Sequence, residues 1–328
     1  MKSAIKFIIA AALIGYLIKS GSLDFTLITK SLDNKTEWIL CGFFLISNVL
    51  TGTLRWKNIL QLSTDNKLQY LQVLKINWIG LLFNTVLPGS VSGDFIKLIY
   101  ARDLDRENFS KTFLITSVLI DRILGLVGLL ILLGLFSIMN YTELAAKSSE
   151  LKNLLHFNFL VFIFVILFVI SILLPVTIQS FILNIIGKLP IIAKHATKAL
   201  EQIWMIGSNK KILFGNIVLS MIGQTFFILG FWSIATPFFE TAIPFQYALT
   251  FIPLGLCTIA IPITPQGLGV GHVAFKTLFS YFGQSNGDSL FNLYFLSGVT
   301  VNLLGIIPYL LYRNNHDIKS EMQEFETN

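Results

Sequence analysis

Two long apolar stretches of the sequence are interrupted by proline and glycine, and each interruption is followed by side chains that could bind an anion. The first interruption contains Pro88, Gly89 and Gly93, and Asp94 and Lys97 follow it. The second is longer and contains Pro262, Pro265, Gly267, Gly269 and Gly271, followed by His272 and Lys276. A helix that restarts after such a break has unpaired backbone N–H groups and the positive end of its dipole at its first turn. We therefore expect each restart to attract negative charge.

Basic residues after the two breaks could bind a phosphate group entering from either side. The candidates are Lys97 and Arg102 after the first break and Lys276 after the second. Asp94 could contact the same group, cap the restarted helix or pair with Lys97. Lysine side chains near a membrane surface also commonly reach out to water, so substrate contact and simple solvation are both open for Lys97 and Arg102.

Three further polar residues are expected inside apolar segments. Asp121 and Arg122 are neighbours in the sequence, but adjacent helical positions diverge by about 100 degrees, so each is expected to need another partner. A structural ion pair and a site in a transport path are equally open for them. His272 is the one histidine expected at depth, where a hydrogen-bonded scaffold is more common than a proton relay.

The composition excludes an ordinary soluble protein. Only 13% of the residues are charged, against roughly a quarter in soluble domains, and 54% are hydrophobic. The two cysteines are far apart, and no spacing typical of a metal site, a phosphate-binding loop or a nucleophile elbow is present. We expect no cofactor, no metal and no enzyme activity. The net charge of +6 is explained by membrane topology without nucleic-acid binding.

Apolar segments of suitable length predict an all-α integral membrane protein with six spanning helices. They cover residues 4–18, 38–54, 112–139, 157–178, 212–239 and 289–312. The two interrupted stretches are predicted to be re-entrant broken hairpins at 70–105 and 241–283, since proline and glycine break membrane helices and irregular backbone survives there only in a polar interior.

The order of segments is the same in both parts of the chain. Residues 1–140 form a first membrane repeat and residues 155–312 a second, and three spans per repeat make the second inverted, which predicts a central binding site. Ordinary helices joined by proline- and glycine-rich loops are the alternative. Most basic residues then fall on one side, which predicts a plasma or inner membrane protein with both termini and the short tail 313–328 in the cytoplasm.

The spacing Asn84-x3-Pro88-Gly89-x3-Gly93-Asp94-x2-Lys97, the later P-x-T-P-x-G-L-G-V motif from Pro262 and the intervening Asp121-Arg122 pair resemble the lysylphosphatidylglycerol synthase transmembrane-region family. The resemblance covers nearly the whole chain and implies a flippase-like lipid transporter, with Asn84 among the residues near its substrate. Many relatives have a glutamate where this chain has His272. The soluble aminoacyltransferase domain of the synthase is not expected, since sixteen residues follow Tyr312.

The residues and the resemblance together predict a transporter that moves an anionic phospholipid or a polyprenyl-phosphate type of lipid across the bilayer. Its partners would be membrane lipids with anionic headgroups. Two alternatives are open: an intramembrane lipid-modifying enzyme, and a membrane scaffold or accessory subunit that recruits a cytoplasmic lipid- or glycan-modifying enzyme without transporting anything.

Overall fold

The computed structural model describes residues 25–86, 92–187, 207–260 and 269–312, together with a few single residues between 188 and 206. Every regular element in these ranges is a helix, which confirms the predicted all-α class. Several predictions lie outside the described residues: the span at 4–18, the tail at 313–328, and Pro88, Gly89, Pro262, Pro265 and Gly267 of the two breaks.

Five helical segments are long and apolar enough to cross a membrane. They are α3 (Lys35–Leu60) with the short turn η1 (Gln61–Ser63), α6 (Lys111–Met139), α8 (Ser149–Ile172), α11 (Lys210–Ala235) with η2 (Thr236–Phe238), and α14 (Gly287–Leu303) with α15 (Ile306–Tyr312). Short helices α2 (Phe25–Ser31), α7 (Tyr141–Ala145) and α9 (Val176–Ile186) precede or follow them. The chain is therefore a multi-pass membrane protein.

Two predicted span boundaries are wrong. The span predicted at 157–178 begins eight residues earlier, where Ser148 caps α8 by accepting a hydrogen bond from the N–H of Leu151, and it ends at Ile172 before Pro175 starts α9. The span predicted to end at residue 54 continues as helix to Leu60. Arg55 therefore lies within a helix that is long and apolar enough to span a membrane, although its charge indicated a loop.

Two pairs of shorter helices lie where the broken hairpins are predicted. The first pair is α4 (Tyr70–Val86) and α5 (Ser92–Arg102), of 17 and 11 residues, and the second is α12 (Phe245–Ala260) and α13 (Val270–Ser280), of 16 and 11 residues. Within each pair the two helices pack against each other. Both hairpins therefore have almost the same dimensions.

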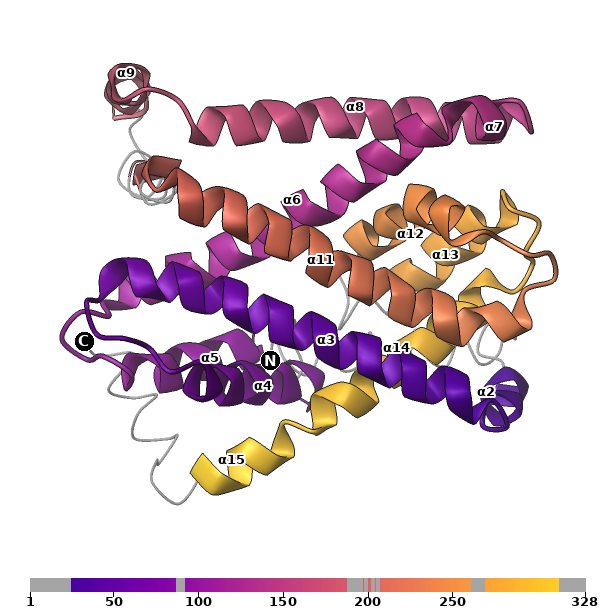
Figure 1. Ribbon diagram of the computed structural model, residues 1–328, viewed down its shortest axis with the longest axis horizontal. Coiled ribbons are helices and arrows are strands. Elements are labelled where there is room, and N and C mark those ends of the chain that lie inside the picture. Colours follow the sequence, from indigo (N-terminus) through magenta and orange to yellow (C-terminus); the bar gives the residue numbers. More distant parts are fainter. Residues whose placement is uncertain are drawn as a thin grey trace, which may run out of the picture.

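The two long helices α3 and α11 form the antiparallel centre of the molecule. Asn58 near the end of α3 hydrogen bonds to Asn216 near the start of α11, and Asn48 donates to the carbonyl of Gly223 further along. Small residues let the helices approach closely: a Cβ on Gly230 would lie 3.3 Å from Leu45. In Figure 1 the α4–α5 hairpin lies on one side of this pair and the α12–α13 hairpin on the other.

The packing of the first set of helices is matched by the packing of the second set. Helix α6 contacts α11 and α12, while α14 contacts α3 and α4. In the same way α3 contacts α4 and α6, and α11 contacts α12 and α14; α5 packs on α6, and α13 on α14. Each of these contacts thus has a counterpart made by helices of the other half.

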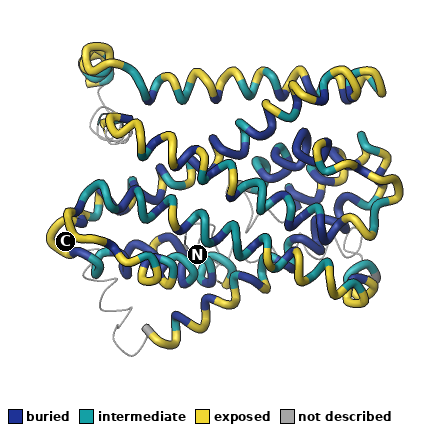
Figure 2. Tube along the Cα trace, viewed as in Figure 1, coloured by how far each residue is buried: buried dark blue, intermediate teal, exposed yellow. Residues whose placement is uncertain are grey.

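Burial differs sharply between the elements. Figure 2 shows buried residues concentrated in α12, α13 and α14, whereas α8 is exposed along much of its length. The exposed side chains of α8 are large and apolar, and include Phe157, Leu160, Ile163, Phe164 and Leu167. A helix with such a face is suited to contact with lipid rather than with water.

Candidate functional site in the first hairpin

A tight contact between α4 and α5 positions the first site. A Cβ atom on Gly93 would lie 1.9 Å from the carbonyl oxygen of Gly80, so only glycine allows this approach. The side chain of Asn84 spans the gap between the two helices, because its Oδ1 accepts a hydrogen bond of 2.9 Å from the N–H of Gly93. The first turn of α5 is thereby fixed against α4.

Asp94 is held next to this contact and faces α6. Its carboxylate pairs with the Arg122 guanidinium at 2.6 Å and accepts a longer hydrogen bond of 3.4 Å from Asn84 Nδ2. The Arg122 side chain is 43% exposed and that of Asp94 is 12% exposed. Lys97, which the sequence suggested as a partner of Asp94, is not its ion-pair partner.

Asp121 has a different partner on a different helix. It accepts a hydrogen bond of 2.7 Å from Nε of Arg55 on α3, and both side chains are largely buried. Nη1 of Arg55 also donates to Ser220 on α11 at 3.0 Å, and its guanidinium lies against Gly125. The prediction that Asp121 and Arg122 need separate partners is confirmed, and Arg55 joins α3, α6 and α11.

Lys97 lies between these two ion pairs. Its side chain is only 5% exposed, and Nζ lies 3.7 Å from the centre of the Trp56 ring. Trp56 is itself fixed by a hydrogen bond of 3.2 Å from its indole N–H to Ser117. Among the described residues, Lys97 makes no hydrogen bond and no ion pair, and a cation over an indole ring is its closest interaction.

The five charges form one electrostatic unit. Burial opposes the charged form of Lys97, the nearby carboxylates of Asp121 and Asp94 favour it, and the guanidinium groups of Arg55 and Arg122 oppose it. Three cations thus face two carboxylates, so the cluster of described residues has an excess of one positive charge. Such a cluster, in which the Arg122 side chain is partly exposed, can bind an anion.

The second hairpin places His272 in a neutral setting. Its Nδ1 accepts a hydrogen bond of 3.2 Å from the N–H of Gly269, which has a positive φ of 87° just before α13. Since Nδ1 is an acceptor, Nε2 carries the proton and donates to Oδ1 of Asn292 at 2.5 Å. Both ring nitrogens of the neutral imidazole are therefore used in fixing the start of α13 against α14.

The remaining predicted site residues do not join the charged cluster. Lys276 is 60% exposed and pairs with Asp288 on α14 at 3.4 Å. Figure 1 shows α13, which carries it, well away from α5. Arg102 is half-buried in the last turn of α5 and makes no ion pair with the described residues. Gly271 packs under Phe291.

Two residues of the cluster, Arg55 and Trp56, were missed from sequence. Arg55 follows the apolar stretch 38–54 directly, and a charge at that place indicates the end of a span. An intramembrane charge elsewhere, at Asp121, is the one signal that a buried basic partner was required. No group of three His, Cys, Asp or Glu side chains that could hold a metal occurs in the described part of the chain.

Comparison with known proteins agrees with this architecture. The family described as "Lysylphosphatidylglycerol synthase TM region" matches residues 3–307, which is nearly the whole chain. None of the curated proteins compared with the chain matches it. Since the matched region includes all the described helices up to the start of α15, the chain belongs to the lysylphosphatidylglycerol synthase transmembrane-region family.

Proposed function

We propose that the protein moves a lipid with an anionic headgroup, of the phospholipid or polyprenyl-phosphate type, across the bilayer. The observation that carries the proposal is the cluster of three cations and two carboxylates at the break of a short hairpin in a membrane protein. Charges inside a membrane are costly, and they mark substrate paths when they face an interior cavity or a partner. The Asp94–Lys97 region has that character.

An inverted repeat would place this cluster between two halves of a transporter. The antiparallel packing of α3 on α11, the matched helix contacts and the matched hairpin lengths all support two oppositely oriented repeats, 1–140 and 155–312. In transporters built from such repeats, the substrate binds near the repeat interface at interrupted helices.

The lengths of the helices support re-entry of both hairpins. An 11-residue helix such as α5 or α13 is about 16 Å long and a 17-residue helix about 25 Å, against a hydrocarbon core of about 30 Å. Neither helix of a pair is long enough to reach across, which supports a chain that turns back within the membrane. With both termini in the cytoplasm, the first hairpin would open to that side of the cell membrane.

The mechanism uses exchange of partners. Arg122 is paired with Asp94 but is partly exposed, so an incoming phosphate can compete with Asp94 for the guanidinium. Lys97 then lies one turn further along α5 to receive the same group. The acyl tails stay against apolar helices in lipid while the headgroup passes through the polar interior. The chain performs no chemical step on the lipid.

The test is a flipping assay in proteoliposomes with fluorescent phosphatidylglycerol, phosphatidylethanolamine and a polyprenyl phosphate. Anionic lipid should move, and Arg122→Gln should slow it about tenfold or more, the loss expected for one charge-assisted contact of about 1.4 kcal/mol. Arg102→Gln, at the end of α5, removes an arginine that makes no ion pair with the described residues; it is the matched basic control and should change the rate less than twofold. Lipid recovered from the vesicles should have an unchanged mass.

If no lipid moves although the protein is folded and a gradient is supplied, the transport proposal is wrong. Co-purification with a cytoplasmic lipid- or glycan-modifying enzyme would then favour the scaffold.

A further inference from the structure

We propose that the first hairpin holds a phosphate site with Lys97 as its central ligand. The second hairpin contributes no ligand to this site. The inference rests on the proposed function only for the source of the phosphate, which is a lipid headgroup rather than free phosphate. The site itself follows from the arrangement of buried charge.

Counted over the described residues, the cluster around Lys97 lacks one negative charge. The Arg55–Asp121 and Arg122–Asp94 pairs balance each other, and Lys97 is left over with 5% exposure and no acceptor among the described residues. Leaving a charge unpaired in a buried environment is strongly unfavourable. The cation–π contact with Trp56 offsets part of this cost and leaves the ammonium free to bind an anion.

The surroundings of Lys97 match a phosphate group better than a carboxylate. A point-charge ammonium, a guanidinium fork and the N–H groups of a helix's first turn are the three donors that commonly bind phosphate. Lys97 and Arg122 supply the first two, and α5 begins at Ser92, five residues before Lys97. The exposed face of Arg122 gives the anion a way in.

The second hairpin repeats the frame of this site without its charge. Trp56 and Phe231 are each the twenty-second residue of their helices, α3 and α11. Lys97 and Phe275 are each the sixth residue of α5 and α13. Phe275 lies edge-on to Phe231, with ring centres 4.9 Å apart, just as Lys97 lies over Trp56. The position of the ammonium is thus filled by a phenyl ring.

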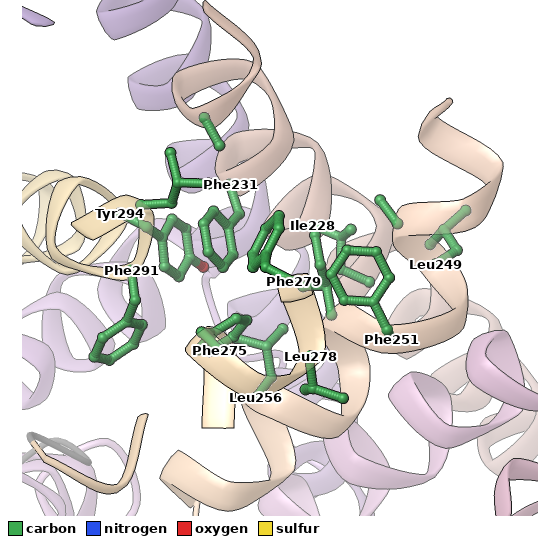
Figure 3. Close-up of a cluster of buried hydrophobic side chains, with 14 of the residues drawn as sticks. Ile228, Phe231, Leu249, Phe251, Leu256, Phe275, Leu278, Phe279, Phe291 and Tyr294 are labelled. Carbon is green, nitrogen blue, oxygen red and sulfur yellow. The ribbon is translucent and has the colours of Figure 1, made fainter. Parts of the chain in front are cut away.

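Neighbouring positions confirm this register. Gly80 is the eleventh residue of α4, and Gly255 is the eleventh residue of α12. A Cβ on Gly80 would contact Lys97, and a Cβ on Gly255 would contact Phe275. Figure 3 shows Phe275 within a cluster of aromatic rings that includes Phe231 and Phe291. Phe275 stacks on Phe291 at 5.2 Å. Within the described part of the chain, packed rings therefore occupy the position that the ammonium takes in the first hairpin.

Lys276, the basic residue that the sequence suggests as the partner of Lys97, is one position further along its helix. One helical position turns a side chain by about 100 degrees, which takes Lys276 out of the equivalent place and into its pair with Asp288. It is therefore the natural control: a lysine on the counterpart helix that the inference excludes from the site.

The experiment measures equilibrium binding to the purified full chain in uncharged detergent. Calorimetric titrations use inorganic phosphate, a short-chain phosphatidylglycerol and, as a neutral control, a short-chain diacylglycerol. The phosphatidylglycerol should bind saturably and the diacylglycerol should not. Lys97→Met should weaken binding about tenfold or more, while Lys276→Met should change it less than twofold. Lys97→Arg should retain most of the affinity.

Tryptophan fluorescence locates the site independently. Binding should move the ammonium off the Trp56 ring, so a saturable emission change is expected in the parent protein. The change should disappear in Trp56→Phe, a substitution that copies the residue found at the equivalent position 231. Thermal unfolding in the same detergent verifies that each variant is folded.

Every outcome decides the inference. Equal affinity of folded Lys97→Met and parent, or loss of affinity in Lys276→Met, overturns it, as does the absence of saturable binding. If inorganic phosphate binds and phosphatidylglycerol does not, the inference that the phosphate belongs to a lipid headgroup is overturned. Lys97-dependent phosphatidylglycerol binding without flipping supports the inference and rejects the transport proposal, whereas flipping at the parent rate in Lys97→Met rejects the inference and keeps transport.

Discussion

The α4–α5 hairpin and the α12–α13 hairpin bring the same helical positions into contact, but the first fills them with charge and the second with neutral groups. Asp94 and His272 are each the third residue of α5 and α13. Asp94 forms an ion pair with α6, and neutral His272 forms a hydrogen bond with α14. The same contact between a hairpin and its following helix is therefore made by two different kinds of interaction.

The bases of the hairpins, where each hairpin joins the neighbouring long helices, show the same difference. Asp105, between α5 and α6, binds the side chains of Thr64 and Asn66, which lie between α3 and α4. Gln284, between α13 and α14, instead accepts from the N–H of Glu240 and donates to the carbonyl of Thr241, between α11 and α12. Each hairpin is fastened at its base, once by a carboxylate and once by an amide.

This comparison teaches where a membrane protein can concentrate function. The backbone frame is shared, so the differences lie in the side chains that fill it. Buried charge destabilises unless it is paired, and the second hairpin packs with neutral residues, His272 and Phe275, at the positions of Asp94 and Lys97. The ionic groups of the first hairpin are thus not required for the frame, which makes binding the better explanation of their presence.

The largest effect is expected from giving the second hairpin the residue of the first. Phe275→Lys removes a fully buried ring and places an unpaired ammonium among aromatic side chains, which should cost more than about 4 kcal/mol and abolish folding. Lys97→Met removes an unpaired charge at similar volume and should leave stability equal or higher. Unfolding in SDS measures both.

A stable Phe275→Lys protein would mean that the second hairpin admits a cation, and the asymmetry between the hairpins would have to be abandoned. Phe275→Leu is its control, since it keeps an apolar side chain there and should cost about 1–3 kcal/mol.

Alanine substitutions at the hairpin glycines should separate the two frames next. In Gly93→Ala the new methyl group would meet the backbone carbonyl of Gly80, so the helices must move apart, at a cost of about 3 kcal/mol. In Gly255→Ala the methyl group meets only the Phe275 ring, which can shift, so a loss of about 1–2 kcal/mol is expected. Equal thermal midpoints for the two variants would contradict this order.

The buried ion pair of the first half should show a smaller loss. Asp121→Asn leaves Arg55 without its carboxylate and should cost about 2–3 kcal/mol. The double variant Arg55→Met, Asp121→Leu should recover most of that stability, because it removes both charges at similar volume. If the double variant is as unstable as the single one, the pair is not the source of the loss, and a double-mutant cycle by SDS titration will reveal it.

Much of this frame could be predicted from the sequence, but its register could not. The proline and glycine breaks, the helical class and the separate partners of Asp121 and Arg122 all follow from residue type and spacing. The pairing of Lys97 with Lys276 rested on counting basic residues from each break. Counting from the break does not give the first residue of α13, because the start of a helix after a break depends on tertiary packing. In the structure Phe275, not Lys276, is the sixth residue of α13. Arg55 was missed for a related reason: its partner Asp121 lies on another helix, and that contact depends on tertiary packing.

The smallest effect, and the most direct measure of the charge difference, should come from the bases of the hairpins under acid. Hydrogen bonds from Thr64 and Asn108 hold the pKa of Asp105 at about 2, below its ordinary value of 3.8. A carboxyl group whose pKa is lowered by folding stabilises the folded state above its unfolded pKa, and that contribution is lost as the pH falls from about 4 to 2. Asp105→Asn should therefore flatten the fall of the thermal midpoint in this interval relative to the parent.

Gln284→Glu should have the opposite effect on the pH dependence. A carboxylate facing the Thr241 carbonyl is repelled until it is protonated, so this variant should gain stability relative to the parent as the pH falls. Parallel pH profiles for parent, Asp105→Asn and Gln284→Glu would show that the two bases are electrostatically alike, and the contrast between the hairpins would then be confined to the membrane interior.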